Sequence, residues 1–331
     1  MASLRSGGPV YKLGSLIGKG ASVGTPSPVH HPSLKIRHIL QAQVFYATEQ
    51  TTGQLVAVKK SRVSLRVQRT LFQHEARVLR LLCSHPAIPA VHAIGRFKHF
   101  EYLAMELLGP SLGDVEGQLN QVSVSQIAVQ MLSALEYIHS HGLVHRDIKP
   151  DNILFSSQDQ GQIRLIDFGL AHQYEREARS VGPTSEPDFV LGTLPYASLN
   201  AHQGLPLTRR DDLESLAYSL FSILLGRLPW NKPHIATSTP RSVRRCVYAT
   251  KRAWSGVRLS KGYDRAFGQF LDEIRNLGFD EMPLYNQWQG VFTSIADLLG
   301  SSSTPSSDAE KVAGKLLALA GILIEASFYR Y

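Results

Sequence analysis

The sequence is poor in cysteine and lacks any long hydrophobic run. Its two cysteines, Cys83 and Cys246, give no disulfide framework, so we expect a reducing compartment, either the cytoplasm, the nucleus or both. No stretch offers about 18 uncharged apolar residues, so we expect no transmembrane segment. Residues 1–10 contain no apolar run typical of a signal peptide. With 331 residues, of which 43% are hydrophobic, the chain suits a globular protein of two packed lobes.

Acidic residues are outnumbered by basic ones, and the excess is concentrated in one stretch. The net charge is +8, and the segment between residues 241 and 265 holds eight basic residues but only one acid, Asp264. The basic residues of this segment, called the basic stripe below, are Arg241, Arg244, Arg245, Lys251, Arg252, Arg258, Lys261 and Arg265. Such a stripe favours an anionic partner, namely an acidic protein substrate, a nucleic acid or a membrane surface. It equally suits a solvated face without a partner.

Residues 145–152 hold charged and amide side chains at a spacing that indicates a catalytic site. They read His-Arg-Asp-Ile-Lys-Pro-Asp-Asn, which resembles the catalytic loop of a protein kinase. Phosphoryl transfer requires alignment and charge neutralisation more than covalent work by the protein. The resemblance makes Asp147 the acceptor of the attacking hydroxyl's hydrogen bond, Lys149 the cation at the transferred phosphate and Asn152 a Mg²⁺ ligand. The lysine at position 149 is typical of serine/threonine kinases, by family resemblance. The alternative interpretation of the segment is a charged surface turn.

Further motifs fall where a kinase would need them. The strand-like run Leu-Val-Ala-Val-Lys at 55–59 resembles the strand whose lysine contacts the ATP phosphates, which makes Lys59 the candidate. Apolar residues recur at helical spacing from 69 to 82, and Glu75 on that predicted helix is the candidate ion-pair partner of Lys59. An Asp-Phe-Gly triplet follows a second strand-like run, and its Asp167 would hold Mg²⁺.

A buried strand is predicted over residues 103–108, ended by Gly109-Pro110. In the kinase pattern this strand leaves the small lobe beside the adenine of ATP. Met105 would be the gatekeeper residue there, a role compatible with ordinary core packing. The backbone from Glu106 to Leu108 would bind the adenine. A helix over 124–139, with one broad apolar face, would then deliver the chain to the catalytic loop.

The glycine-rich loop of this pattern is interrupted. A strand-like run ends in Gly18 and Gly20, whose bare backbone would lie against phosphates, but the spacing G-x-G-x-x-G-x-V is not kept. Deleting residues 23–41 restores the spacing, with Ala42 at the third glycine. The deleted piece is 19 residues, or 57 nucleotides, and it begins with Val and ends with Gln, which allows the intron borders GT and AG. We therefore hypothesise a translated, unspliced intron; a genuine loop insertion is the alternative, and sequencing the transcript decides between them.

Together the motifs resemble the casein kinase 1 family. The resemblance rests on Leu-Leu-Gly-Pro-Ser-Leu at 107–112, Gly-Thr-Leu-Pro-Tyr-Ala-Ser at 192–198 in place of Ala-Pro-Glu, and Arg-Arg-Asp-Asp-Leu-Glu-Ser-Leu at 209–216. It continues through Leu-Pro-Trp at 228–230, Thr-Lys-Arg at 250–252, Lys-Gly-Tyr at 261–263 and Leu-Gly-Phe at 277–279. It covers roughly residues 8–300 as one protein kinase domain.

The resemblance implies an α+β, bilobal protein-kinase fold, with a small β-rich N-lobe over about 8–106 and a larger helical C-lobe over about 109–300. It implies ATP and Mg²⁺ as cofactors, acidic protein substrates, no dedicated nucleic-acid site and a monomer. It also makes Asp212 the buried helix residue that supports the catalytic loop. For Asp211 and Asp212, capping of the helix N-terminus is the alternative role.

Three positions depart from the family pattern. Members favour substrates with a phosphate or an acid upstream of the target residue, held in a basic pocket. Asp188, Pro195 and Trp254 stand where the resemblance places the cations of that pocket. Because a doubly charged phosphate needs charge-assisted donors, we expect a weakened pocket for phosphate-primed substrates.

The end of the sequence differs in composition from the rest. Residues 301–310 are rich in serine and are predicted to be a linker. Residues 311–331 are a helix-like apolar tail, whose uncharged core at 316–324 is nine residues long. This tail packs on the protein, binds a partner or weakly touches a membrane. It carries no terminal cysteine for lipid attachment.

The sequence thus predicts an active serine/threonine protein kinase. Its rival is a pseudokinase scaffold, in which the catalytic residues persist while the insertion at 23–41 disables the loop that covers the phosphates. A nucleic-acid-binding module built on the basic stripe is a third hypothesis, and it explains that stripe alone.

Overall fold

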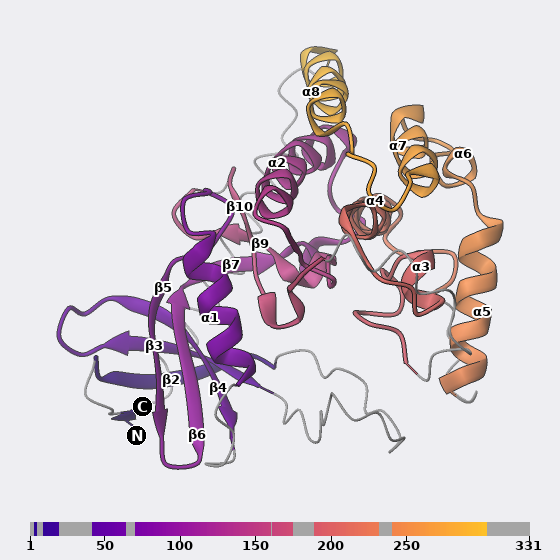
Figure 1. Ribbon diagram of the computed structural model, residues 1–331. Coiled ribbons are helices and arrows are strands. Elements are labelled where there is room, and N and C mark those ends of the chain that lie inside the picture. Colours follow the sequence, from indigo (N-terminus) through magenta and orange to yellow (C-terminus); the bar gives the residue numbers. More distant parts are fainter. Residues whose placement is uncertain are drawn as a thin grey trace.

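The computed structural model describes residues 3–4, 9–19, 42–63, 70–159, 161–174, 189–231 and 240–302 (Figure 1). Strands dominate up to residue 111 and helices beyond it, which confirms the predicted α+β class. The strands are β1 (Ser3–Leu4), β2 (Tyr11–Lys19), β3 (Gln43–Glu49), β4 (Leu55–Arg62), β5 (Val91–Phe97), β6 (Phe100–Glu106), β7 (Leu108–Ser111), β8 (Leu143–Val144), β9 (Ile153–Ser156), β10 (Ile163–Leu165) and β11 (His172–Gln173). The α-helices are α1 (Leu71–Leu81), α2 (Gln121–Ser140), α3 (Leu199–His202), α4 (Arg209–Leu225), α5 (Pro240–Ala253), α6 (Gly256–Leu259), α7 (Arg265–Asn276) and α8 (Tyr285–Ser302). Short 3₁₀ turns lie at Leu112–Val115, Pro150–Asn152 and Phe168–Leu170.

Six strands form one antiparallel sheet in the order β1-β2-β3-β4-β6-β5. The turn between β3 and β4 is fixed by the Glu49 carboxylate, which accepts the N–H of Thr51 at 3.0 Å and of Thr52 at 2.6 Å. Gly53 completes this turn with a left-handed backbone, φ 73°, which glycine adopts without steric cost. The turn brings β4 back beside β3 in the register that places Lys59 opposite Val44.

Helix α1 carries an acidic residue on its buried face. A capping box begins the helix, because the Thr70 side chain accepts the N–H of Gln73 at 3.2 Å and the Gln73 side chain accepts the N–H of Thr70 at 3.4 Å. The buried face is apolar apart from Glu75, which is 1% exposed. Because a buried carboxylate is stable only beside a cation or strong donors, this packing calls for a cation near α1.

The C-terminal part is built around α4. Every residue of α4 from 209 to 224 except Arg210 is buried, and the helix packs between α2 and α7. In Figure 1, α2 lies against α8, while α5, α6 and α7 lie on the other flank of α4. One apolar core runs from Phe72 of α1 through Met105 to these helices, so the two parts share an interior. The acidic residues of α4 therefore point into the protein rather than into water.

A small sheet, β10-β9-β7, lies where the two parts meet. The predicted end of the strand over 103–108 is wrong, since β6 stops at Glu106 and the Gly109-Pro110 pair lies inside β7. The β7–β9 pairing shifts register between Leu108 and Ser111. A proline has no N–H to donate and is tolerated at such an irregularity, so Pro110 does not end the strand.

Helix α3 is joined to α5 through His202. The imidazole Nε2 of His202 lies 3.3 Å from Nζ of Lys251, and its ring centre lies 5.6 Å from that of Tyr248. Burial lowers the pKa of His202 to about 3, with the charges of Lys251 and Arg244 as further causes. His202 is therefore neutral in the folded protein at neutral pH.

We expect His202 to make stability depend on pH. Its ordinary pKa is 6.5 and its folded pKa is about 3, so between these values the unfolded chain binds a proton that the folded chain does not. The free energy of unfolding is then highest above pH ~6.5 and falls as the pH drops towards 3. The measurement is the melting temperature at about pH 7 and about pH 5. Wild type should lose more on acidification than His202→Asn, which cannot titrate; equal losses would contradict the assignment.

Several predicted features lie outside the described residues, namely Gly20, the insertion at 23–41, Asp188 and the tail at 311–331. The first two residues of the predicted linker lie in α8, which extends through Ser302. The Ser301 hydroxyl donates to the Asp297 carbonyl at 2.7 Å, one turn earlier, so its hydrogen bond is made within the helix. Among the helices described, none combines the length and the apolar character needed to cross a bilayer.

Candidate active site

Lys59 of β4 lies between two carboxylates. Its Nζ is 2.9 Å from Oε2 of Glu75 on α1 and 2.7 Å from Oδ1 of Asp167, which follows β10. The side chain of Lys59 is 12% exposed. Burial opposes its charge, yet Glu75 and Asp167 raise the pKa of Lys59 above the usual value. Burial likewise opposes the charge of Asp167, and Lys59 lowers its pKa. The cation that α1 requires is thus Lys59, in the pairing predicted from the sequence.

Asp147 follows β8 and is contacted from two directions. Nζ of Lys149 lies 3.0 Å from Oδ2 of Asp147. The Thr193 hydroxyl donates to Oδ1 of Asp147 at 2.7 Å and accepts from Lys149 at 2.8 Å. A carboxylate, an ammonium and a hydroxyl therefore form a closed set of contacts. Sequence reasoning missed Thr193: the motif at 192–198 contains it, but local spacing does not show that it reaches a loop 46 residues earlier.

Asp212 of α4 supports this loop from the protein interior. Its Oδ2 accepts the N–H of His145 at 2.7 Å, and its Oδ1 accepts the N–H of Arg146 at 2.8 Å. Nε2 of His139 on α2 lies 2.9 Å from Oδ2. Burial opposes the charge of Asp212, and the His139 contact lowers its pKa. Arg146 has a left-handed backbone, φ 69°, which is uncommon for a residue other than glycine. The hydrogen bond that its N–H donates to Asp212 holds it in this conformation. The cap of α4 is Thr208, so capping is not the role of Asp212.

Asn152 and Asp167 offer oxygens of the kind that Mg²⁺ binds. The amide nitrogen of Asn152 donates to the carbonyl of Asp147 at 2.9 Å, which leaves the amide oxygen for a cation. The Ile166 N–H donates to the Asn152 carbonyl at 2.9 Å, so the two loops are tied together. Asp167 is held in a left-handed conformation, φ 66° and ψ 58°. Because Mg²⁺ takes one or two protein oxygens and completes its shell with phosphates and water, this donor set fits the predicted metal.

Comparisons with known proteins agree with this geometry. The protein kinase domain family matches residues 41–278. The chain belongs to the protein kinase family. Casein kinase I homolog 2 of Saccharomyces cerevisiae is 31% identical to this kinase over 312 residues, which cover 92% of this chain and 53% of that protein. The predicted resemblance to the casein kinase 1 family is thereby confirmed, and the chain spans about half the length of this relative.

Residues 106–108, called the hinge below, connect the two lobes through side chains as well as backbone. Met105 is 7% exposed and packs in the core that both lobes share. Oε1 of Glu106 lies 3.3 Å from Nε of Arg164 on β10, and the Glu106 N–H donates to the Ala90 carbonyl at 2.9 Å. Leu108 begins β7. The Glu106 carboxylate also accepts the N–H of Ala90 at 3.3 Å, so it contacts both lobes. The adenine contacts predicted for Met105, Glu106 and Leu108 stay predictions.

The glycine-rich loop of the kinase is described only at its start. Gly18 lies near the end of β2, opposite Val44 of β3. A Cβ built on Gly18 would meet the Val44 Cβ at 3.9 Å, an ordinary contact. The strand itself therefore does not require a glycine at position 18, and a need for bare backbone would come from a bound phosphate. Gly20 and its role stay a prediction, since it lies outside the described residues.

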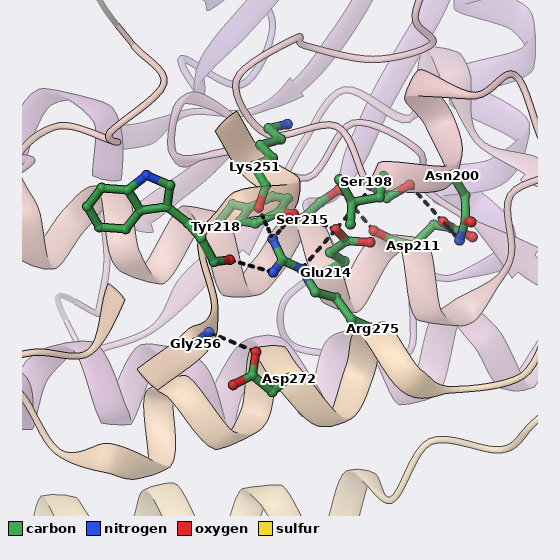
Figure 2. A network of polar contacts seen from close by, with 12 residues as sticks. Ser198, Asn200, Asp211, Glu214, Ser215, Tyr218, Lys251, Gly256, Asp272 and Arg275 are labelled. Atoms are coloured by element: carbon green, nitrogen blue, oxygen red, sulfur yellow. Dashed lines mark hydrogen bonds and ion pairs between the residues drawn. The ribbon is translucent and has the colours of Figure 1, made fainter. Parts of the chain in front are cut away.

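Two acids of α4 hold the segment that follows Thr193 (Figure 2). Asp211 accepts from the Ser198 hydroxyl at 2.7 Å and from the Asn200 amide at 3.0 Å. Glu214 accepts the N–H of Leu199 at 3.2 Å. Both acids are at most 4% exposed. The kinase lacks Ala-Pro-Glu, and this segment is held instead by side chains of α4.

The positions predicted to weaken the basic pocket have other partners. The Pro195 carbonyl accepts from the Trp230 indole at 2.8 Å. The Arg258 guanidinium lies over the Trp254 ring, 4.0 Å from its centre. Arg258 thus supplies one cation beside a position where the pattern loses one. The weakened pocket itself stays a prediction, and Asp188 lies outside the described residues.

The basic stripe is not a uniform surface. Arg245, Arg252 and Arg265 are exposed, but Lys251 is 0% exposed. The prediction of a basic surface is therefore wrong at position 251. Lys251 lies four residues after the buried Val247, and residues four apart share a face of a helix. Helix phase therefore turns this one lysine into the protein.

Proposed function

We propose that this kinase transfers the γ-phosphoryl group of ATP to serine or threonine in protein substrates. The observation that carries the proposal is the direct bonding between the two loops that bear Asp147, Asn152 and Asp167. Lys59 reaches the same place from the small lobe, through its 2.7 Å contact with Asp167. Four side chains from three segments thus meet, as phosphoryl transfer requires.

In the proposed reaction, Asp147 accepts the proton of the attacking serine or threonine hydroxyl. The hydroxyl oxygen bonds to the γ-phosphorus as the bond to the oxygen that bridges it to the β-phosphate breaks, and ADP leaves. Lys149, 3.0 Å from Asp147, neutralises negative charge on the γ-phosphoryl group during its transfer. Lys59 orients the α- and β-phosphates and is itself held by Glu75.

The cofactors of this proposal are ATP and Mg²⁺. When bound, Mg²⁺ would supply positive charge that offsets the negative charge of the ATP phosphates. Asn152 and Asp167 would hold it through the amide oxygen and the carboxylate described above. Asp167 has one oxygen on Lys59, so the same carboxylate links the phosphate-binding lysine to the metal position.

The proposed substrates are acidic proteins. The exposed members of the basic stripe, among them Arg245, Arg252 and Arg265, lie on α5 and α7 on one flank of the C-lobe (Figure 1). A surface of one charge sign raises the local concentration of an oppositely charged partner and weakens with salt. We therefore expect acidic residues to favour a substrate more than a single phosphate does.

A phosphate upstream of the target serine is expected to help this kinase little. Pro195 and Trp254 supply no cation, and the Arg258 guanidinium is partly engaged with the Trp254 ring. The measurement is kcat/KM on two peptides that differ only in a phosphoserine upstream of the target. We expect a gain below about tenfold, or ~1.4 kcal/mol; a larger gain would contradict the weakened pocket.

The proposed activity is tested by a paired assay. The chain as written and a variant lacking residues 23–41 are incubated with Mg²⁺, ATP and a serine peptide, with Asp147→Asn as the blank. Transfer by both forms supports the proposal. Transfer by the deleted form alone indicates the pseudokinase scaffold, in which the insertion disables the loop. Binding of ATP without transfer by either form contradicts the proposed activity.

A further inference from the structure

Lys251 of α5 is a buried lysine whose amine is bonded to backbone. Its Nζ donates to the carbonyl of Ala197 at 2.6 Å and to the carbonyl of Leu194 at 2.9 Å. The residue is 0% exposed, although it lies in a run of basic residues. A lysine is almost never fully buried without a specific requirement for its donors. The carbonyls of Leu194 and Ala197 are the acceptors that explain this burial, and both belong to the segment that follows Thr193.

Two aromatic rings lie beside the Lys251 amine. Its Nζ lies 4.8 Å from the ring centre of Tyr218 and 5.6 Å from that of Trp230. Burial lowers the pKa of Lys251, and the nearby Glu214 opposes this shift. Either protonation state keeps two N–H groups for the two carbonyls, so the anchoring does not depend on the charge. Arg275, whose Nε lies 3.6 Å from Glu214, also donates to the Lys251 carbonyl at 3.0 Å and so fixes the backbone of Lys251.

The carbonyls that follow Thr193 are nearly all occupied. The Thr193 carbonyl accepts the N–H groups of Tyr196 and Ala197, both at 2.9 Å, which closes a tight turn. The Pro195 carbonyl is bonded to Trp230, and Lys251 holds those of Leu194 and Ala197. Lys251 is thus the residue that grips the turn at two points. Because the Thr193 hydroxyl lies 2.7 Å from Asp147, a movement of this turn would displace that hydroxyl from the catalytic loop.

We propose that Lys251 is a positioning residue for phosphoryl transfer, which fixes the turn at residues 193–197 and through it the Thr193 hydroxyl between Asp147 and Lys149. This inference rests on the proposed kinase activity. Lys251 touches neither nucleotide nor substrate in this role; it acts through the backbone of the turn. The turn takes the place of Ala-Pro-Glu in the sequence, and Lys251 supplies an anchor for it from α5.

The test compares wild type with Lys251→Met, which keeps the length and apolar character of the side chain but removes both donors. Arg227→Met is the matched control, because Arg227 is an exposed cation in the same lobe. Three quantities are measured: kcat on a serine peptide, the Kd of a fluorescent ATP analogue with Mg²⁺, and the melting temperature. A fourth is hydrogen exchange at the amides of Tyr196 and Ala197.

For Lys251→Met we expect kcat to fall by roughly 10- to 100-fold, because displacement of a catalytic group by about 1 Å costs that much. The Kd of the nucleotide should stay unchanged, since Lys59 and the hinge are untouched. The melting temperature should fall moderately, because the buried carbonyls of Leu194 and Ala197 lose their donor, but the rest of the C-lobe should stay folded. The amides of Tyr196 and Ala197 should exchange faster while those of α4 do not.

Unchanged kcat with unchanged exchange would overturn the inference. A fall in kcat matched by faster exchange throughout the C-lobe would overturn it too, because Lys251 would then be structural only. If wild type transfers no phosphate, the proposed function fails and takes the catalytic part of the inference with it. The exchange measurement still decides whether Lys251 anchors the turn.

Discussion

Asp147→Asn is expected to lower kcat for peptide phosphorylation by about 10²- to 10⁴-fold, the usual contribution of a positioned base. Asparagine keeps the size of the side chain and its contact with Thr193, but it cannot take the proton of the attacking hydroxyl. The Lys59 cluster and the hinge do not touch this side chain, so the Kd for ATP should stay unchanged. The measurements are steady-state kinetics and nucleotide titration on the same preparation.

The matched control for this variant is Asp297→Asn, the same change on an exposed residue of α8. It should leave kcat at the wild-type value. A kcat of Asp147→Asn within a few fold of wild type would mean that Asp147 does not act as the base. Loss of nucleotide binding in Asp147→Asn would mean that the substitution disturbs more than the proton acceptor.

Lys59→Met is expected to lower kcat/KM by on the order of 100-fold or more, since it removes the cation that orients the phosphates. It also leaves Glu75 and Asp167 without the ammonium between them, so at least one carboxyl should take up a proton. The effect should not add to that of Glu75→Gln: once Lys59 is gone, Glu75 has nothing to hold. Kinetics of the two single variants and the double variant measure this coupling.

Lys60→Met is the control for this series, because Lys60 is the next residue of β4 and its Nζ lies over the Phe100 ring, 4.2 Å from the centre. Removing that cation should leave kcat/KM unchanged. Fully additive effects of Lys59→Met and Glu75→Gln would contradict the assignment of Glu75 as the residue that holds Lys59.

The local elements of this protein follow from local patterns. The run at 55–59, the helical spacing around Glu75 and the triplet at Asp167 each lie in the element that its pattern predicts. These motifs are specific because phosphoryl transfer fixes both the residue type and its place at the end of a strand or in a tight loop. The support by Asp212 came from the family resemblance, since an acid near a helix N-terminus alone indicates a cap.

The features that the sequence did not reveal depend on contacts between distant segments. Thr193 gains its place by reaching Asp147 across 46 residues, and no periodicity encodes that contact. The strand end at Glu106 was misplaced because Gly109 and Pro110 usually end a strand, whereas an irregular ladder admits them. The sequence did indicate the burial of Lys251, because Lys251 continues a helical face through Val243 and Val247. The neighbouring basic residues nevertheless led to the prediction of an exposed stripe.

The most direct test of the central claim, that Lys59, Asp147, Asn152 and Asp167 serve one nucleotide–metal pair, is the rate of transfer from radiolabelled ATP to a serine peptide as Mg²⁺ is varied. Wild type should turn over many times, stop when Mg²⁺ is chelated, and need far less Mg²⁺ than Asp167→Asn does. An Asp167→Asn protein with the wild-type dependence on Mg²⁺, or a wild type that binds ATP and transfers nothing at any Mg²⁺ concentration, would contradict the claim.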